Sequence, residues 1–151
     1  MARTNLVTDP SLRSGTTNGY LALNGAVLEY SDEYAWYGAG SLKVVKSGDN
    51  NSGVSTAIPI PVVAGQPYAA SVYARLPLEL PPEEEAHVTL QVEWRNSLNT
   101  VVSVDTSATL TLDDTQWSRI GGVWTAPVGA TVAFIHVTQV IGGSPGDELY
   151  L

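Results

Sequence analysis

The chain has 151 residues, of which 44% are hydrophobic, 8% aromatic and 15% charged. This composition excludes an intrinsically disordered protein, which would have more charged and fewer aromatic residues. A chain of this length buries enough surface to fold without disulfides or metals. We therefore expect one domain over residues 1–151, either a whole protein or the N-terminal part of a longer one. The absence of cysteine excludes zinc–thiolate sites, iron–sulfur clusters, cysteine nucleophiles and disulfide-stapled scaffolds.

The chain is acidic, with 7 Lys and Arg residues against 15 Asp and Glu residues and a formal net charge of -8. This charge repels the phosphate backbone that dominates nucleic-acid affinity, so no nucleic-acid partner is expected. The longest apolar runs, residues 58–64 and 132–135, are far shorter than the roughly 18 residues of a membrane span, so no membrane partner is expected. Residues 1–7 show no signal-peptide pattern, which predicts synthesis in a cytoplasm.

Glycine and proline residues are spread along the whole chain, which is typical of many short strands separated by turns. The first clear element is Asn24-Gly25, a type I′ turn sequence that predicts a hairpin between residues 20–23 and 26–30. Further strands are predicted at residues 41–47, 53–60, 67–76, 86–95, 100–111, 116–125, 131–141 and 147–151. Residues 78–85, rich in proline and glutamate, are predicted to form an exposed loop.

Several predicted strands alternate between apolar and polar residues, as strands with one buried face do. The residues predicted to face the core are Val88, Leu90, Val92, Trp94, Val72, Leu42 and Val44. About ten such strands, with no helix to connect parallel strands, predict an all-β protein with an antiparallel β-sandwich of the jelly-roll kind. A closed barrel is the alternative fold.

The sequence contains no recognisable catalytic motif. His87 and His136 lie 49 positions apart, without the spacing of metal ligands or of a nucleophile–histidine pair. No GxSxG sequence occurs, and residues 38–41 lack the features of a phosphate-binding loop. We therefore expect no enzyme activity, no catalytic residue and no metal-binding residue. A glycoside hydrolase would need two carboxylates that face each other across a cleft.

Two groups of residues are candidates for contacts with carbohydrate. The first lies in the aromatic segment 30–37, where some rings should be exposed, and comprises Tyr34, Trp36 and Tyr37. Rings with a polar edge can stack on sugars, although aromatic residues are equally common in protein interfaces. The second group is the outward row of two predicted strands, which forms one polar face if these strands are neighbours. This row contains Tyr73, Arg75, Gln91, Glu93 and Arg95.

Five groups of short motifs follow one another along almost the whole chain. They are the opening segment 5–12, the Gly-Ser-Leu strand 40–44, the turn and strand 64–75, the tryptophan strand 93–95, and the late tryptophan strand with its Ala-Pro-x-Gly turn at 115–130. In this order they resemble the carbohydrate-binding modules of families 4, 9 and 22, which belong to the galactose-binding-like jelly-roll class. The resemblance implies a sandwich fold and a concave sheet face that binds extended sugars.

Modules of this kind often hold a structural calcium ion. In this chain Leu12-Arg13 replaces the usual Phe-Glu, and the sequence stops at Tyr150-Leu151, before the aspartate that would complete the site. Calcium requires six to eight oxygen ligands, and Arg13 supplies none. We therefore expect no cofactor and no bound calcium.

The opening residues 2–8 resemble the N-termini of tail and capsid-surface proteins of phages that infect actinobacteria. This resemblance implies a location in the virion after synthesis in the host cytoplasm, which also fits the absence of cysteine. The predicted function is a non-catalytic virion structural protein, a minor tail or capsid-decoration component that either packs on the particle or contacts host surface glycans. Its predicted partners are other virion proteins and further copies of itself on the particle. The alternative is a carbohydrate-binding module of a glycan-active enzyme.

Overall fold

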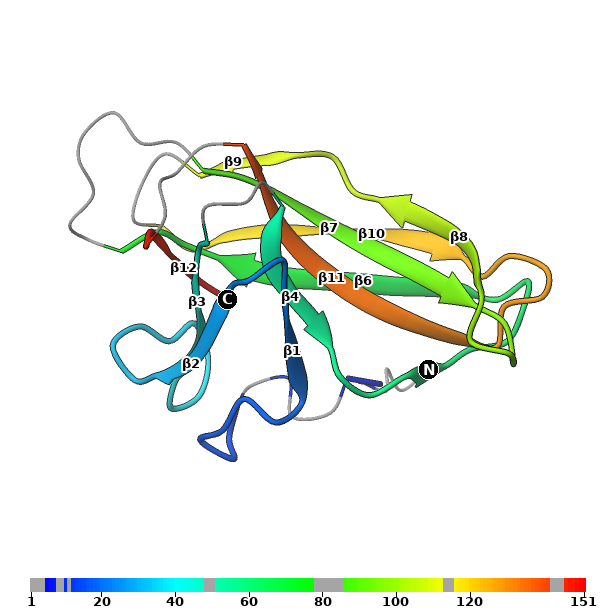
Figure 1. Ribbon diagram of the computed structural model, residues 1–151, viewed down its shortest axis with the longest axis horizontal. Helices are drawn as coiled ribbons and strands as arrows, with labels where there is room; N and C mark the ends of the chain where they lie inside the picture. The colour runs from blue at the N-terminus through cyan, green and yellow to red at the C-terminus, as the bar shows by residue number, and fades with distance from the viewer. Residues whose placement is uncertain are drawn as a thin grey trace.

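The computed structural model describes residues 5–7, 10, 12–47, 51–77, 86–112, 116–141 and 146–151 (Figure 1). These residues form strands and turns, and none of them is helical, so the described chain contains no helix that could cross a membrane. The strands are β1 (Tyr20–Leu23), β2 (Val27–Ser31), β3 (Ser41–Val45), β4 (Ser52–Thr56), β5 (Ile60–Pro61), β6 (Pro67–Ala74), β7 (Ala86–Arg95), β8 (Val101–Thr106), β9 (Leu110–Leu112), β10 (Ser118–Thr125), β11 (Val132–Ile141) and β12 (Glu148–Tyr150).

The larger sheet has the strand order β1-β4-β11-β7-β8, and every pairing in it is antiparallel. Two short strands extend it, because β5 pairs with β11 and β9 pairs with β7. The long strands β7 and β11 form its centre. Side chains from these two strands therefore dominate both faces of this sheet.

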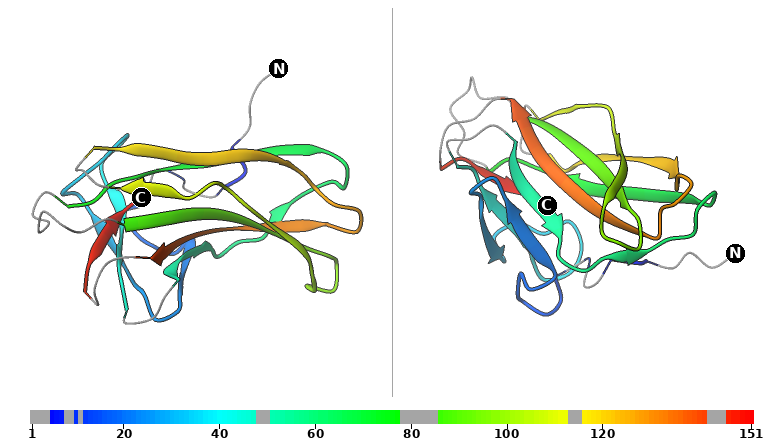
Figure 2. Two further views of the ribbon diagram at one scale, coloured as in Figure 1. Left: turned by 90° about the horizontal axis from the view of Figure 1, so that it is seen from above. Right: turned by 45° about the vertical axis from the view of Figure 1, so that its right-hand side comes forward.

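The second layer consists of two smaller groups of strands, β10-β6 and β12-β3-β2. An antiparallel bridge joins them, in which the backbone N–H groups of Arg75 and Tyr150 each donate to the other residue's carbonyl at 3.0 Å. The layer thus runs in the order β2-β3-β12-β6-β10. Figure 2 shows β6 and β10 stacked over β7 and β11. The predicted antiparallel sandwich is confirmed.

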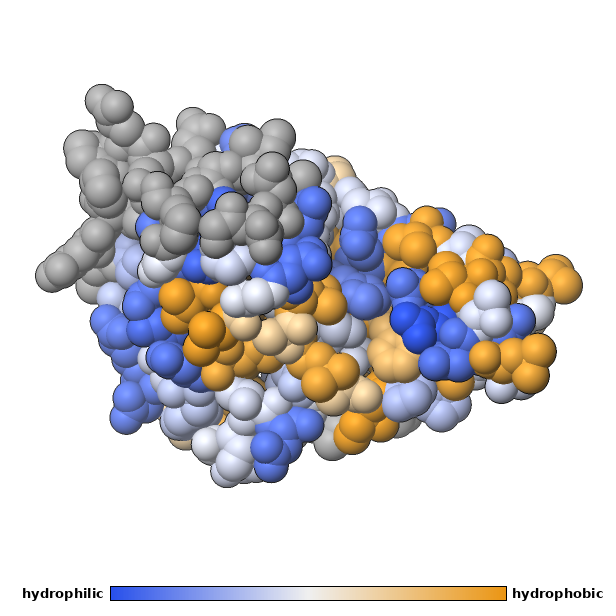
Figure 3. Space-filling model, in the orientation of Figure 1, coloured by the Kyte–Doolittle hydropathy of each residue, from blue (hydrophilic) through white to orange (hydrophobic). Residues whose placement is uncertain are grey.

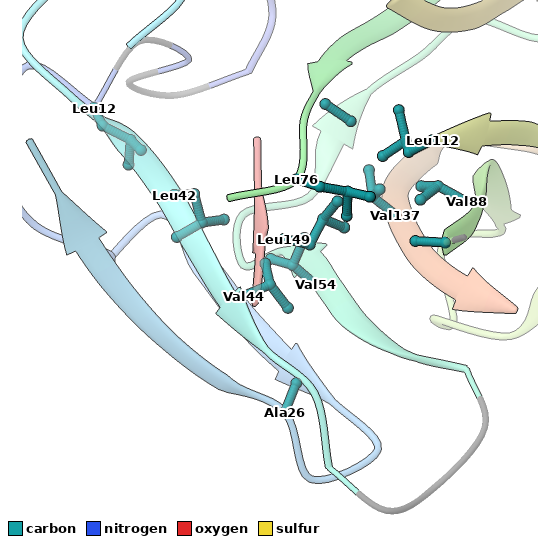
Figure 4. Packing of buried hydrophobic residues seen from close by; sticks show 12 residues of the cluster. Leu12, Ala26, Leu42, Val44, Val54, Leu76, Val88, Leu112, Val137 and Leu149 are labelled. Atoms are coloured by element: carbon teal, nitrogen blue, oxygen red, sulfur yellow. The ribbon is translucent and has the colours of Figure 1, made fainter. Parts of the chain in front are cut away.

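The core lies between the two layers and consists of two clusters. One cluster joins β3 and β12 to β4, β7 and β11, and it includes Leu42, Val44, Val88 and Leu149 (Figure 4). The other lies under the opposite half of the large sheet and is centred on Trp94, whose side chain has no exposed surface. All the residues predicted to face the core do so: Val88, Leu90, Val92, Trp94, Leu42 and Val44 are buried, and the half-buried Val72 packs against both clusters.

The predicted hairpin at Asn24-Gly25 is wrong in its pairing, although the turn itself is present. Both residues have positive φ angles, 51° and 74°, and Ala26 N–H donates to the Leu23 carbonyl at 3.1 Å. However, β1 pairs with β4 in the large sheet, whereas β2 pairs with β3 in the second layer. The turn is therefore a corner between the layers. Ser47 holds it in place by donating from Oγ to the Asn24 carbonyl at 2.6 Å.

The other strand predictions agree closely with the structure, except that two predicted strands are each divided into two shorter ones. The predicted strand 53–60 is divided into β4 and β5, and the predicted strand 100–111 is divided into β8 and β9. These divisions raise the number of described strands from the predicted ten or so to twelve. The predicted exposed loop at 78–85 lies outside the described residues.

Candidate functional site

Polar side chains lie among apolar ones on the outer face of the large sheet. The Cα register aligns one residue from each of five strands in a single row, and this row is Leu21, Ser55, His136, Gln91 and Thr106. The next rows along β7 place Glu93 beside Phe134 and Arg95 beside Val132. We call Gln91, Glu93, Arg95, Phe134 and His136 the polar face. In the view of Figure 3, hydrophilic residues lie between hydrophobic patches over β7 and β11.

Arg95 is held rigidly on this face. Its Nε and Nη2 atoms both contact Oε1 of Glu93, and Nη1 donates to Oδ1 of Asn99 at 3.0 Å. The guanidinium carbon lies 4.9 Å from the centre of the Phe134 ring. The charge-assisted hydrogen bonds and the ring contact together fix the side chain in one orientation. Arg95 and Glu93 therefore present a neutral, pre-ordered pair.

His136 is the least satisfied group of the polar face. Its Nε2 atom is buried, has no hydrogen-bond partner, and lies 4.0 Å from Oε1 of Glu93. Burial lowers the pKa of His136 below its usual value, the positive charge of Arg95 adds to this effect, and the carboxylate of Glu93 opposes it. The ring thus carries a buried nitrogen whose hydrogen-bonding capacity is unused.

A second group of candidate residues surrounds the loop 32–40, which links β2 to β3 and folds over the outer face of the second layer. Trp36 stacks on Tyr73 of β6, with ring centres 4.3 Å apart and an angle of 17° between the planes. The guanidinium carbon of Arg75 lies 3.9 Å from the centre of the Tyr34 ring and 5.8 Å from that of Trp117. Trp36 remains 55% exposed and Tyr37 68% exposed. We call Tyr34, Trp36, Tyr37, Tyr73 and Arg75 the aromatic cluster.

The loop is anchored by the buried ring of Tyr150, which Tyr34 meets edge-on at a centre-to-centre distance of 4.7 Å. The Tyr150 hydroxyl lies 2.7 Å from Oε2 of Glu148 and 3.1 Å from Oε2 of Glu33, which belongs to the loop. Burial raises the pKa of Tyr150, and its two carboxylate neighbours raise it further. The hydroxyl therefore stays protonated and donates its single hydrogen to one carboxylate at a time.

Lys43 completes this anchor by binding Oε1 of Glu148. Burial acts to raise the pKa of Glu148, but the hydrogen bonds from Lys43 and Tyr150 outweigh it and lower that pKa. The hydrogen bond to Glu148 raises the pKa of Lys43 in turn. At the other end of the loop, Gly40 lies so close to the Tyr30 ring and the Ser31 carbonyl that a Cβ atom would clash with both. The loop is thus closed at its base.

The structure regroups the predicted carbohydrate-binding residues. The expectation that Tyr73, Arg75, Gln91, Glu93 and Arg95 share one face is wrong, because β6 and β7 belong to different layers. Along its whole length β6 pairs with β10, while β7 is flanked by β11 on one side and by β8 and β9 on the other. Tyr73 and Arg75 instead join Tyr34, Trp36 and Tyr37 in the aromatic cluster.

Sequence reasoning missed Phe134 and His136 as members of the polar face. Alternation along β11 was a usable signal, since Phe134 and His136 share the outward phase of that strand. Among the described residues, no group of three or more histidine or acidic side chains could hold a metal ion. The polar face can therefore offer hydrogen bonds and ring contacts to a ligand.

No protein-family model matches the sequence, and no curated protein sequence is significantly similar to it. Solved structures are similar in fold. The CBM22-2 xylan-binding domain of Xyn10C from Paenibacillus barcinonensis has a TM-score of 0.73 at 15% identity, covering 93% of this chain and 91% of that one. The C-terminal family 22 carbohydrate-binding module of Xyn10B from Clostridium thermocellum has a TM-score of 0.69 at 20% identity, covering 90% and 82%.

A phage protein is also similar. The enzymatically active domain of tailspike protein 4 from bacteriophage CBA120 has a TM-score of 0.68 at 10% identity, covering 97% of this chain and 20% of that one. At such low identities these similarities concern the fold alone. The chain has the jelly-roll fold seen in carbohydrate-binding modules.

Proposed function

We propose that the protein is a non-catalytic carbohydrate-binding protein and that the polar face is its binding surface. The observation that carries this proposal is the arrangement of Gln91, Glu93, Arg95 and His136 as half-buried side chains on the two central strands of the large sheet, where Glu93 and Arg95 hold each other in place. Fixed donors and acceptors suit sugar hydroxyls, which both donate and accept hydrogen bonds, because little ordering remains to be done on binding.

His136 gives the proposal a specific contact. A sugar hydroxyl that donates to or accepts from Nε2 would satisfy a buried atom that has no partner in the free protein. Leaving a buried polar atom unsatisfied costs about 1–3 kcal/mol, so a ligand that satisfies it gains a corresponding advantage. Gln91 lies directly beside His136 in the register and extends the same row.

The arrangement favours binding over hydrolysis. A glycosidase uses one carboxyl group as an acid and a second one as a nucleophile or base. The carboxylate of Glu93 is instead occupied by Arg95, and Asn99 holds the other side of the guanidinium. The Glu93 carboxylate is therefore engaged within the protein, as the carboxyl groups of such a catalytic pair are not.

Neutral polysaccharides are the ligand class that we propose for the polar face, because its charged pair is internally neutralised. Domains of similar fold are named for xylan binding, so xylohexaose is the first probe. Isothermal titration calorimetry should detect binding to the parent, and Gln91→Ala combined with His136→Ala should weaken it at least tenfold. Gln66→Ala, in the exposed turn before β6, is the matched control and should bind like the parent.

Failure of the parent to bind xylohexaose, or any panel of neutral cell-wall polysaccharides, would remove the polar face as a carbohydrate site. Equal affinity of the double variant and the parent would have the same consequence. Thermal unfolding of each variant shows whether a loss of binding is local or follows from a loss of folding.

We also propose a virion context, in which the protein is a minor tail or capsid-decoration component, assembles with other virion proteins and copies of itself, and contacts host surface glycans. The fold similarity to a phage tailspike domain supports this context. Mass spectrometry of gradient-purified particles should find the protein. Glycan binding without particle association would instead favour the second candidate, a module of a glycan-active enzyme, which the fold similarity to modules of xylanases supports.

A further inference from the structure

The outer face of the second layer carries an exposed aromatic surface that the polar face does not use. Trp36 covers Tyr73, and the pair forms a nearly parallel stack whose outer member, Trp36, is 55% exposed. The side chain comes from a loop that is closed at its base by Tyr30, whose hydroxyl donates to the Ala39 carbonyl at 3.1 Å. One face of the indole is thus covered by Tyr73, and much of the rest of the ring is exposed to solvent.

An arginine lies next to this stack. Arg119 of β10 is the direct Cα partner of Tyr73 in the antiparallel pairing, and its side chain is exposed. Directly opposed residues in such a pair place their side chains on the same face, with Cβ atoms about 4.5–5.5 Å apart. Arg119 and Tyr73 therefore project from the same outer face of the second layer.

Two arginines lie on this surface although the protein is acidic overall. The chain has 7 Lys and Arg residues and a formal net charge of -8. Arg75 lies over the Tyr34 ring, and Arg119 lies opposite Tyr73 on the same face. The nearby carboxylate of Glu33 is directed to the Tyr150 hydroxyl. An exposed arginine on the same face as an exposed ring can pair with an anionic group of a ligand that stacks on that ring.

We propose that Trp36, Tyr73 and Arg119 form a second carbohydrate site, selective for polysaccharides that contain uronic acids. The apolar face of one uronic acid ring would stack on Trp36, and the carboxylate of the same uronic acid would pair with Arg119. Aromatic rings stack on the apolar faces of sugars, and a guanidinium matches the two oxygens of a carboxylate. This site lies on other strands than the polar face and takes a different ligand. An experiment can therefore refute either proposal without affecting the other.

Uronic acid fits this surface better than other anions do. A uronic acid has its carboxylate attached directly to the sugar ring, so one residue can reach both the indole and the neighbouring guanidinium. A phosphate in a polyol-phosphate chain lacks a ring for Trp36, and a neutral sugar leaves Arg119 without a partner. The geometry of one ring beside one cation thus selects a ring that carries its own charge.

The test is isothermal titration calorimetry with hexagalacturonate and its methyl ester, which keeps the rings and removes the charges. The parent should bind the acid at least tenfold more tightly than the ester. Trp36→Ala should weaken binding of both ligands at least tenfold. Arg119→Gln should weaken binding of the acid at least tenfold and leave binding of the ester unchanged.

Two controls separate this site from a general charge effect and from the polar face. Arg13→Gln makes the same change in net charge without touching Tyr73 and should retain binding of the acid within about twofold. The variant Gln91→Ala with His136→Ala should also bind the acid like the parent. Equal affinity for acid and ester, parent-like binding by Arg119→Gln, or no binding of the acid by the parent would overturn the proposal, whatever the result with xylohexaose.

Discussion

The polar face and the aromatic cluster lie on opposite outer surfaces of the sandwich and are built in different ways. The polar face takes its side chains from the regular register of β7 and β11, where pairing over nine aligned positions fixes each Cα atom. The aromatic cluster takes three of its five members from a loop whose position depends on a few side-chain contacts. Backbone pairing can therefore order hydrogen-bonding groups, whereas an exposed stacking ring needs contacts of its own.

The two regions also differ in what they leave unsatisfied. On the polar face, Glu93 and Arg95 satisfy each other, and His136 retains a buried atom without a partner. In the aromatic cluster, Tyr34 and Arg75 satisfy each other, and Trp36 retains an exposed ring. Each region thus combines an internally satisfied pair with one further group, which is a buried unsatisfied nitrogen on the polar face and an exposed ring in the aromatic cluster.

The largest expected effect is the loss of stability when the core residue that supports the polar face, Trp94, is removed. Trp94 lies on β7 between Glu93 and Arg95, points into the core, and donates from Nε1 to Oδ2 of Asp105 at 2.7 Å. Trp94→Ala should lower the free energy of unfolding by about 3–5 kcal/mol, because it leaves a cavity. Trp36→Ala, the same change at an exposed ring, should cost less than about 1 kcal/mol in chemical denaturation. Equal costs would refute the assignment of β7's inward phase.

The next effect concerns the anchor of the aromatic cluster. Tyr34→Ala removes the edge-on contact with Tyr150 and the cation–π contact with Arg75. These two contacts predict a loss of about 1–2.5 kcal/mol in the free energy of unfolding. Tyr37→Ala, at a ring that is 68% exposed, should cost less than about 0.5 kcal/mol. If the two tyrosines proved equivalent, the loop would not be held as described.

A smaller effect should distinguish the regions by their response to pH. The pKa of His136 is lowered in the folded protein by burial, so the unfolded chain binds a proton more readily. The contribution of His136 to stability is therefore fully present above about pH 6.5. It decreases as the pH falls from about 6.5 toward the lowered pKa of the folded protein.

Denaturant unfolding between pH 7.5 and pH 5 measures this contribution. His136→Gln should flatten the pH dependence in that range. Gln66→Ala, which removes no titratable group, is the control and should retain the slope of the parent. An unchanged slope in His136→Gln would mean that the ring is more open to water than the structure indicates.

The smallest expected effect is that of chelation, which should leave both regions unchanged. We predict the same melting temperature with and without EDTA, because Arg13 occupies a position where a calcium ligand would be expected. A structural ion at a hundredfold excess over its dissociation constant would add about 2.7 kcal/mol, so its removal would be obvious. A melting temperature lowered by several degrees in EDTA would show that such an ion is bound.

Much of the fold could be predicted from local patterns. Alternation along β7 correctly separates the buried Val88 and Trp94 from the outward Gln91 and Glu93, because side chains alternate between the faces of a strand. Strand partners could not be predicted in the same way. The turn at Asn24-Gly25 has the backbone angles that its sequence requires, but β1 pairs with the later strand β4, and β2 pairs with the following strand β3.

The candidate sites show the same limit. The aromatic segment 30–37 indicates exposed rings from composition alone, and Trp36 and Tyr37 are indeed exposed. Only the layer assignment of β6 could show that Tyr73 belongs beside Trp36 and not beside Gln91. Pairing across the chain, which periodicity does not encode, decides which outward residues share a face.

The most direct test of the account is a chemical-shift titration of the isotope-labelled protein with xylohexaose and, separately, with hexagalacturonate. We predict that xylohexaose perturbs the amide signals of β7 and β11 around Gln91 and His136. We predict that hexagalacturonate perturbs the Trp36 indole signal and the amides around Tyr73 and Arg119. Perturbation of the same residues by both ligands, or of neither region by either ligand, would contradict the central claim that this sandwich carries two separate carbohydrate-binding surfaces.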